Sequence, residues 1–146
     1  MVCGEKEMTD ADFPAPSEGI VLTHFVVPAD VAASNAFYVG VLGGKTVMVG
    51  PPSIVKLANS WIIINEGGRP TEDKPEVVLD VPSDPNRVAA FLNIRVADIQ
   101  KVHGEWSAKG AVFLTPPIDR GAEIRCYMRD PDGHLIEVGQ ATGVLS

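Results

Sequence analysis

Glu137 is the residue whose type and sequence setting point most directly to a functional site. It follows the turn sequence DPDG at residues 130–133, in which proline presets its own φ and glycine tolerates the positive φ of a chain reversal. The residues after this turn alternate as in a strand, which places Glu137 and Gly139 on one face and Ile136 on the other. A lone carboxylate among apolar neighbours on a buried strand requires a cation or several hydrogen-bond donors. Glu137 is therefore predicted to face a site, and the alternative is a glutamate at a solvent-exposed sheet edge.

Four other polar side chains on predicted strands are candidates for contacts with a small molecule. Asn93 and Arg95 share one face of a strand, and an arginine can grip a carboxylate or phosphate through two hydrogen bonds. Arg125 and Tyr127 alternate in the same way with apolar residues. These four residues are predicted to bind a ligand.

Some of these candidates have a purely structural alternative. Either arginine could instead form an internal salt bridge to Glu123 or Glu137, which needs no ligand. Trp61 is a candidate stacking surface for a flat ligand, and its alternative is an ordinary place in the core.

One order of elements occurs twice along the chain and is predicted to position these residues. In the first copy, a strand precedes a helix that Asp30 caps and Gly43 ends, and three short strands follow. In the second copy, Asp98 is the predicted cap of the helix and Gly110 its predicted end. An internal repeat of this size sets the architecture. The predicted strands are residues 19–27, 45–50, 53–59, 60–66, 89–96, 111–117, 123–130 and 134–140.

The segments between and before the copies lack such patterns. Residues 1–18 are acidic, are interrupted by Pro14 and Pro16 and show no periodicity, which predicts a flexible tail before a single domain at 19–146. Within that domain, module one is assigned to residues 19–66 and module two to residues 88–140. Residues 67–87 are rich in Gly, Pro, Asp and Glu and are interpreted as the linker.

Composition narrows the classes of partner. A chain of 146 residues that is 45% hydrophobic has the size of one globular domain, and its net charge of −7 argues against a nucleic-acid or anionic-membrane surface. No apolar run reaches the ~20 residues of a membrane span, and the N-terminus lacks the apolar stretch of a signal peptide. The two cysteines lie far apart and form neither a disulfide framework nor a zinc spacing. These features predict a cytoplasmic protein.

Two segments, FYVGVLGG at residues 37–44 and RDPDGHLIEVGQ at residues 129–140, resemble the vicinal oxygen chelate superfamily of glyoxalases, bleomycin resistance proteins and extradiol dioxygenases. The likeness covers roughly residues 20–140 and is more specific in the second segment. It implies an α+β fold, in which two tandem βαβββ modules form a cupped, barrel-like mixed sheet with the helices outside. It also implies a small-molecule ligand in the cup and a homodimer.

The resemblance implies a metal site that this sequence matches only in part. In metal-dependent members, ligands come from the first strand of each module and from the last strand of one or both, so His24 and Glu137 are the candidate ligands of one divalent ion. At the other matched positions stand Phe91 or Asn93 and Ile63. Counting back from the helix caps pairs His24 with Leu92 on the outer face, although a shorter strand exit would turn it inward. His103 and His134 are predicted to be exposed.

Two functions of different class follow from the resemblance. One is a metal-dependent lyase of glyoxalase type or a dioxygenase, in which Glu137 is catalytic because it binds the cation or moves a proton. The other is a metal-free protein that sequesters an antibiotic or an aromatic metabolite. A structural or regulatory homodimer without chemistry is the third alternative.

Overall fold

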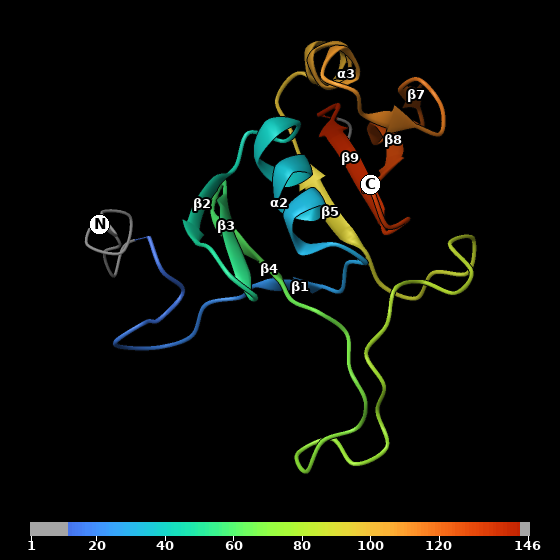
Figure 1. Cartoon of the computed structure of the whole chain (residues 1–146). Coiled ribbons are helices and arrows are strands. Elements are labelled where there is room, and N and C mark those ends of the chain that lie inside the picture. The colour runs from blue at the N-terminus through green and yellow to red at the C-terminus, as the bar shows by residue number, and fades with distance from the viewer. Residues whose placement is uncertain (1–11, 144–146) are drawn as a thin grey trace. The chain divides into compact units, whose positions relative to one another are not determined.

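The computed structural model describes residues 12–143 and divides the chain into two compact units, with the boundary between Val81 and Pro82 (Figure 1). Each unit contains one sheet and one helix, in the order strand, helix and then further strands. The prediction of an α+β fold with two βαβββ modules is therefore confirmed. No helix within residues 12–143 has the length and apolar character that a membrane crossing requires.

The first unit has a four-stranded mixed sheet. Its strand order is β1-β4-β3-β2, in which β1 pairs with β4 in parallel and the other pairs are antiparallel. The elements are β1 (His24–Val26), α2 (Val31–Gly40), β2 (Lys45–Met48), β3 (Ser53–Leu57) and β4 (Ser60–Ile64).

Capping residues fix both ends of α2. The Asp30 carboxylate accepts hydrogen bonds from the backbone N–H groups of Ala32 and Ala33 at 2.9 and 3.3 Å, as predicted for an N-cap. At the other end Gly43 has a φ of +84°, a conformation that favours glycine and lets the chain turn back toward β2.

The helix α2 covers one face of this sheet. Its Asn35 side chain hydrogen bonds to Thr46, which lies opposite Val55 in the β2–β3 register. Val55 in turn lies opposite Ile62, and both are almost fully buried. This face is the main core of the first unit.

The other face of the same sheet carries a separate apolar cluster. Val47, Ile54 and Trp61 are buried there, and Phe13 packs against them. The Trp61 indole N–H donates to the backbone carbonyl of Asp12 at 2.9 Å. Of the predicted N-terminal tail, residues 1–11 lie outside the described residues, whereas residues 12 and 13 contact the sheet.

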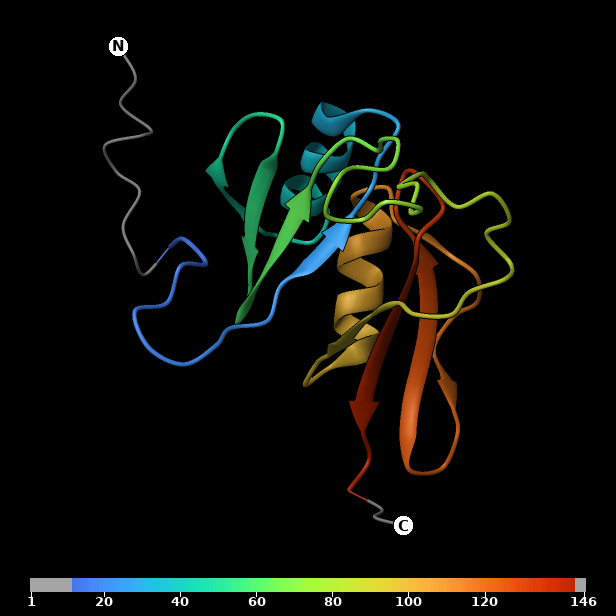
Figure 2. The same cartoon turned by 90° about the horizontal axis from the view of Figure 1, so that it is seen from below.

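The second unit repeats the plan with a five-stranded sheet. Four of its strands have the order β5-β9-β8-β6, and the fifth, β7, pairs with β8. The parallel pair β5–β9 corresponds to β1–β4, and Figure 2 shows the long antiparallel pair β8–β9. The strand predicted at 111–117 is corrected to a shorter one at 112–113, because Pro116 and Pro117 have no N–H to donate to the sheet, and a further short strand that was not predicted follows at 118–119. The elements are β5 (Leu92–Arg95), α3 (Ile99–Ala108), β6 (Val112–Phe113), β7 (Ile118–Asp119), β8 (Glu123–Arg129) and β9 (Leu135–Ala141).

The helix α3 covers one face of the second sheet. Asp98 caps it by accepting the Lys101 N–H at 3.1 Å, and the Ile99 N–H donates to the Gln140 side chain of β9 at 2.7 Å. The His103 ring lies 4.4 Å from that of Phe113. His103 and His134, predicted to be exposed, are half-buried. The side chains of Cys126, Met128, Ile136 and Val138 are buried on the helix-covered face.

Candidate functional site

The candidate site lies on the open face of the second unit's sheet, which is the face opposite α3. Residues directly opposite one another in neighbouring strands point to the same face. Tyr127 of β8 lies opposite Glu137 of β9, which lies opposite Asn93 of β5. The next row along the strands is Arg125, Gly139 and Arg95. The structure thus brings together five of the residues selected from the sequence.

Glu137 is the buried charged group of this face, with 6% of its surface exposed. The Asn93 side-chain amide donates to its Oε1 atom at 2.8 Å. Among residues 12–143, Asn93 is the one side chain that donates a hydrogen bond to the Glu137 carboxylate. A buried carboxylate with one donor retains capacity to accept further hydrogen bonds.

The two arginines of the next row share one carboxylate. Arg95 Nη1 donates to Glu123 Oε1 at 2.7 Å, and Arg125 Nη1 donates to Glu123 Oε2 at 3.1 Å. The internal salt bridge considered from the sequence is therefore present for both. Gly139 makes room for it, because a Cβ atom there would lie 2.1 Å from Arg95 Nη1.

This ion pair predicts a measurable acid dependence of stability. The hydrogen bonds from Arg95 and then from Arg125 lower the pKa of Glu123 below its ordinary value. The stabilisation is therefore fully present above the pKa of an unfolded glutamate, about 4.3, and is lost as the pH falls through the lower pKa of the folded state. We expect Glu123→Gln to flatten the loss of unfolding free energy between about pH 5 and pH 3.

Urea denaturation at a series of pH values measures this dependence. The pair is solvent-accessible, so the difference should stay below about 1 kcal/mol. Glu105→Gln, at an exposed position of α3, is the matched control. Identical pH profiles for the wild type and Glu123→Gln would show that the ion pair adds no stability.

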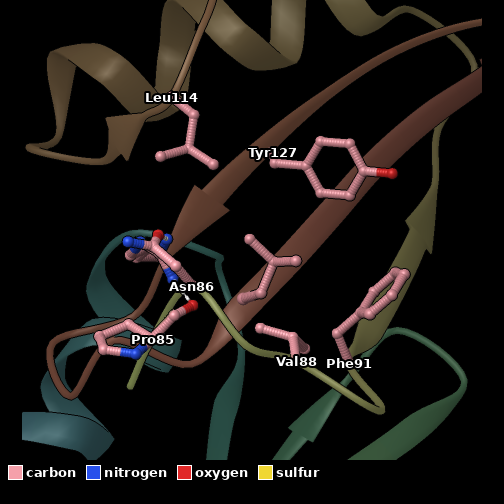
Figure 3. Close-up of a pocket in the computed structure, with 8 residues that line it drawn as sticks. Pro85, Asn86, Val88, Phe91, Leu114 and Tyr127 are labelled. Atoms are coloured by element: carbon pink, nitrogen blue, oxygen red, sulfur yellow. Dashed lines mark hydrogen bonds between the residues drawn. The ribbon is translucent and has the colours of Figure 1, made fainter. Parts of the chain in front are cut away.

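A pocket of about 330 Å³ lies at one end of the open face. The Tyr127 ring stands at 71° to the Phe91 ring, and the two ring centroids lie 6.0 Å apart. Leu114, the residue after β6, also lines the pocket (Figure 3). Aromatic and aliphatic walls with a few polar groups are typical of small-molecule sites. The pocket is lined by Pro85, Asn86, Val88, Phe91, Leu114, Tyr127, Arg129 and Leu135.

Sequence reasoning selected Tyr127 but missed most of this lining. The alternation that selected Glu137 also places Leu135 on the same face, but its apolar side chain gave no separate sign of a site. Pro85 and Asn86 stand in the segment interpreted as a linker, and no pattern in the sequence connects them with a strand.

The residues present do not fit a metal site of the kind that the resemblance implies. His24 lies opposite Ile62, which places the imidazole on the face that α2 covers. The open-face position of β1 is Phe25, opposite Ile63, where the second unit has Asn93 opposite Glu137. Neither Phe nor Ile can coordinate a cation. Across residues 12–143, no group of three His, Cys, Asp or Glu side chains is arranged to hold one.

Trp61 lies in the first unit, on the sheet face opposite α2. The Lys56 ammonium lies 4.3 Å from the centre of its ring, and only 8% of the residue is exposed. In this structure Trp61 is thus a core residue with one cation–π contact, and Phe13 packs beside it.

Comparisons with known proteins agree with this architecture. The family model of the Glyoxalase/Bleomycin resistance protein/Dioxygenase superfamily matches residues 20–138. A comparison with curated protein sequences gives no match.

Solved structures with a similar fold also agree with this architecture. An integron cassette protein from the mobile metagenome of V. cholerae is 27% identical, with a TM-score of 0.64 over 86% of this chain and 98% of that chain. A glyoxalase/bleomycin resistance protein/dioxygenase from Nocardioides is 19% identical, with a TM-score of 0.68 over 90% and 93% of the two chains. TnmS3, an antibiotic binding protein from Streptomyces sp. CB03234, is 16% identical, with a TM-score of 0.63 over 88% and 100%.

Proposed function

Because this chain belongs to the glyoxalase/bleomycin resistance protein/dioxygenase superfamily, we propose that it binds a small molecule with a flat apolar body, without a metal ion, in the pocket of its second unit. The observation that carries the proposal is the pocket itself. Its aromatic and aliphatic lining continues into the row of Asn93 and Glu137 along the open face.

The pocket and the row suggest two kinds of contact with such a ligand. Tyr127 and Phe91 offer ring surfaces inclined at 71° to each other, so that a flat ligand can stack on one and meet the edge of the other. Glu137 lies beside Tyr127 in the row, held by the amide of Asn93, and it can accept a hydrogen bond from a donor group of the ligand. We therefore expect a ligand with an apolar ring system and at least one N–H or O–H group.

The alternative enzymatic function rests on the same glutamate. If Glu137 binds a cation or moves a proton, the chain is a metal-dependent lyase or dioxygenase. The placement of His24 on the helix-covered face weighs against this alternative. TnmS3, which shares the fold, is an antibiotic binding protein, and this favours sequestration. Homodimerisation and a cytoplasmic location stay predictions from the sequence.

A fluorescence titration with N-phenyl-1-naphthylamine, a neutral aromatic dye, tests the proposal. We expect the full-length protein to bind the dye with the same affinity in the presence and absence of EDTA. Tyr127→Ala should weaken binding about tenfold or more, because it removes one ring wall; tenfold corresponds to about 1.4 kcal/mol. Phe25→Ala, at a half-exposed aromatic residue of the first unit, is the matched control and should bind as the wild type does.

Two results would contradict the proposal. Equal dye affinity in Tyr127→Ala and the wild type would place the binding site elsewhere. A stoichiometric divalent metal in the purified protein, lost in both His24→Ala and Glu137→Ala, would rule out metal-free binding and support the enzyme.

A further inference from the structure

Arg129 forms three hydrogen bonds that meet at the pocket. Its Nη1 atom donates to the backbone carbonyls of Pro85 at 2.8 Å and Gly133 at 3.1 Å, and its Nη2 atom donates to Asn86 Oδ1 at 2.8 Å. Arg129 is the last residue of β8, and Gly133 belongs to the turn that leads into β9. One side chain therefore joins the end of a strand, the following turn and a segment more than forty residues earlier.

That earlier segment, residues 84–88, is called here the wall segment, because Pro85, Asn86 and Val88 line the pocket (Figure 3). Its own backbone forms a small turn, in which the N–H of Arg87 donates to the carbonyl of Asp84 at 3.0 Å. The wall segment is not part of any strand. In the described part of the chain, the hydrogen bonds that join it to the sheet are those of Arg129.

The turn at the other end of the contact is well fixed. The Asp130 side chain is buried and accepts the backbone N–H groups of Asp132 and His134, each at 2.9 Å. Pro85 also packs against the turn, since a Cβ atom on Gly133 would lie 3.5 Å from its ring. Arg129 thus ties the wall segment to a turn that is itself held by hydrogen bonds.

We propose that Arg129 is a positioning residue, which holds the wall segment in place as one side of the pocket and thereby sets the affinity for the ligand. This inference rests on the proposed function of the pocket. It does not require Arg129 to touch the ligand. When the wall segment moves away, the pocket loses Pro85, Asn86 and Val88 as contacts, so the bound ligand leaves faster.

The chemistry of arginine explains why this residue type stands here. All three acceptors are neutral oxygens, so the contact depends on the planar fork of donors rather than on charge pairing. A lysine at position 129 would keep the positive charge but concentrate its donors on a single nitrogen. Arg129→Lys therefore separates the geometry of the contact from its charge.

Hydrogen exchange and dye binding together test the inference in the full-length protein. We expect Arg129→Lys to speed the amide exchange of the peptide covering residues 84–90 about tenfold without dye, and to weaken N-phenyl-1-naphthylamine binding about fivefold, mainly through faster dissociation. Asn86→Ala, which removes one acceptor, should show smaller changes in the same direction. The double variant should change by less than the sum, because both substitutions break the same contact.

The outcomes separate this inference from the proposed function. Arg87→Lys, at an exposed arginine of the same segment, is the matched control and should alter neither measurement. Unchanged exchange in both Arg129→Lys and Asn86→Ala would overturn the positioning role. Faster exchange with unaltered dye affinity would overturn the link to binding, while a loss of dye binding in Tyr127→Ala would still support the pocket. If Arg129→Lys does not fold, Asn86→Ala alone decides by the same two criteria.

Discussion

The Met128→Ala variant is expected to lose about 2–5 kcal/mol of unfolding free energy, the range for deleting a large buried side chain and leaving a cavity. Met128 is fully buried and lies opposite Phe113 on one side and Ile136 on the other. Urea denaturation monitored by circular dichroism measures the loss. Met128→Leu keeps most of the volume and should cost less than about 1.5 kcal/mol.

The same variant separates stability from binding. Met128 and Tyr127 are adjacent in β8 and therefore point to opposite faces of the sheet. In conditions where Met128→Ala is folded, its affinity for N-phenyl-1-naphthylamine should equal that of the wild type. Tyr127→Ala should show the reverse pattern, with weak binding and a smaller loss of stability. If both variants lose dye affinity alike, the dye does not distinguish the two faces and the pocket assignment fails.

The second large effect is expected in the first unit, where Gly44→Ala should destabilise the protein by about 1–3 kcal/mol. An added Cβ atom would lie 2.4 Å from Val55 Cγ1 and about 3 Å from the backbone carbonyl oxygens of Tyr38 and Lys56. The side-chain atom belongs to a buried residue, and the carbonyls belong to the backbone of α2 and β3. Moving either of them away from the added Cβ therefore costs free energy. Thermal and urea unfolding measure the effect.

Gly40→Ala is the matched control for this prediction. Gly40 is the last residue of α2, and in the described part of the chain no atom beyond its chain neighbours and the adjacent helix backbone lies within 4 Å of the position that its Cβ would take. The higher helix propensity of alanine should leave the protein as stable as the wild type or up to about 1 kcal/mol more stable. Equal losses in Gly40→Ala and Gly44→Ala would refute the close-contact explanation.

The elements were predictable because local signals agree with tertiary packing. Asp30 and Asp98 cap helices as predicted, and the period-two alternation assigned the faces of β5, β8 and β9 correctly. The family resemblance, which rests on two short motifs, is confirmed by a match over residues 20–138. Strand ends were less predictable, since β1 spans three residues of the nine assigned to it.

The site was only partly predictable, for two physical reasons. The face of His24 depends on a single residue of register, and only the pairing with Ile62 decides it. The wall segment has no periodicity, and its position depends on a side chain more than forty residues away. Contacts of irregular backbone with a distant side chain leave no local signal in a sequence.

The two units show how the repeat has diverged. Where the second unit places Asn93 opposite Glu137, the first places Phe25 opposite Ile63. Where the second has a pocket beside Tyr127, the first has Trp61 with Phe13 packed near it. The buried carboxylate with its amide partner thus occurs in the second copy, whereas the equivalent face of the first copy carries an apolar cluster with Lys56 beside Trp61.

Cys126 lies on the helix-covered face of β8, 1% exposed, and burial raises the pKa of its thiol to about 11. A thiol reagent therefore reacts with it only in molecules whose second unit has opened, and the labelling rate of a Cys3→Ser variant counts these openings. A ligand that binds the closed form at concentration [L] divides that rate by about 1 + [L]/Kd. The labelling rate of the buried thiol can thus report the affinity of a compound whether or not that compound absorbs light. A library can then be searched for the natural ligand by measuring how far each member slows the labelling of this one sulfur atom.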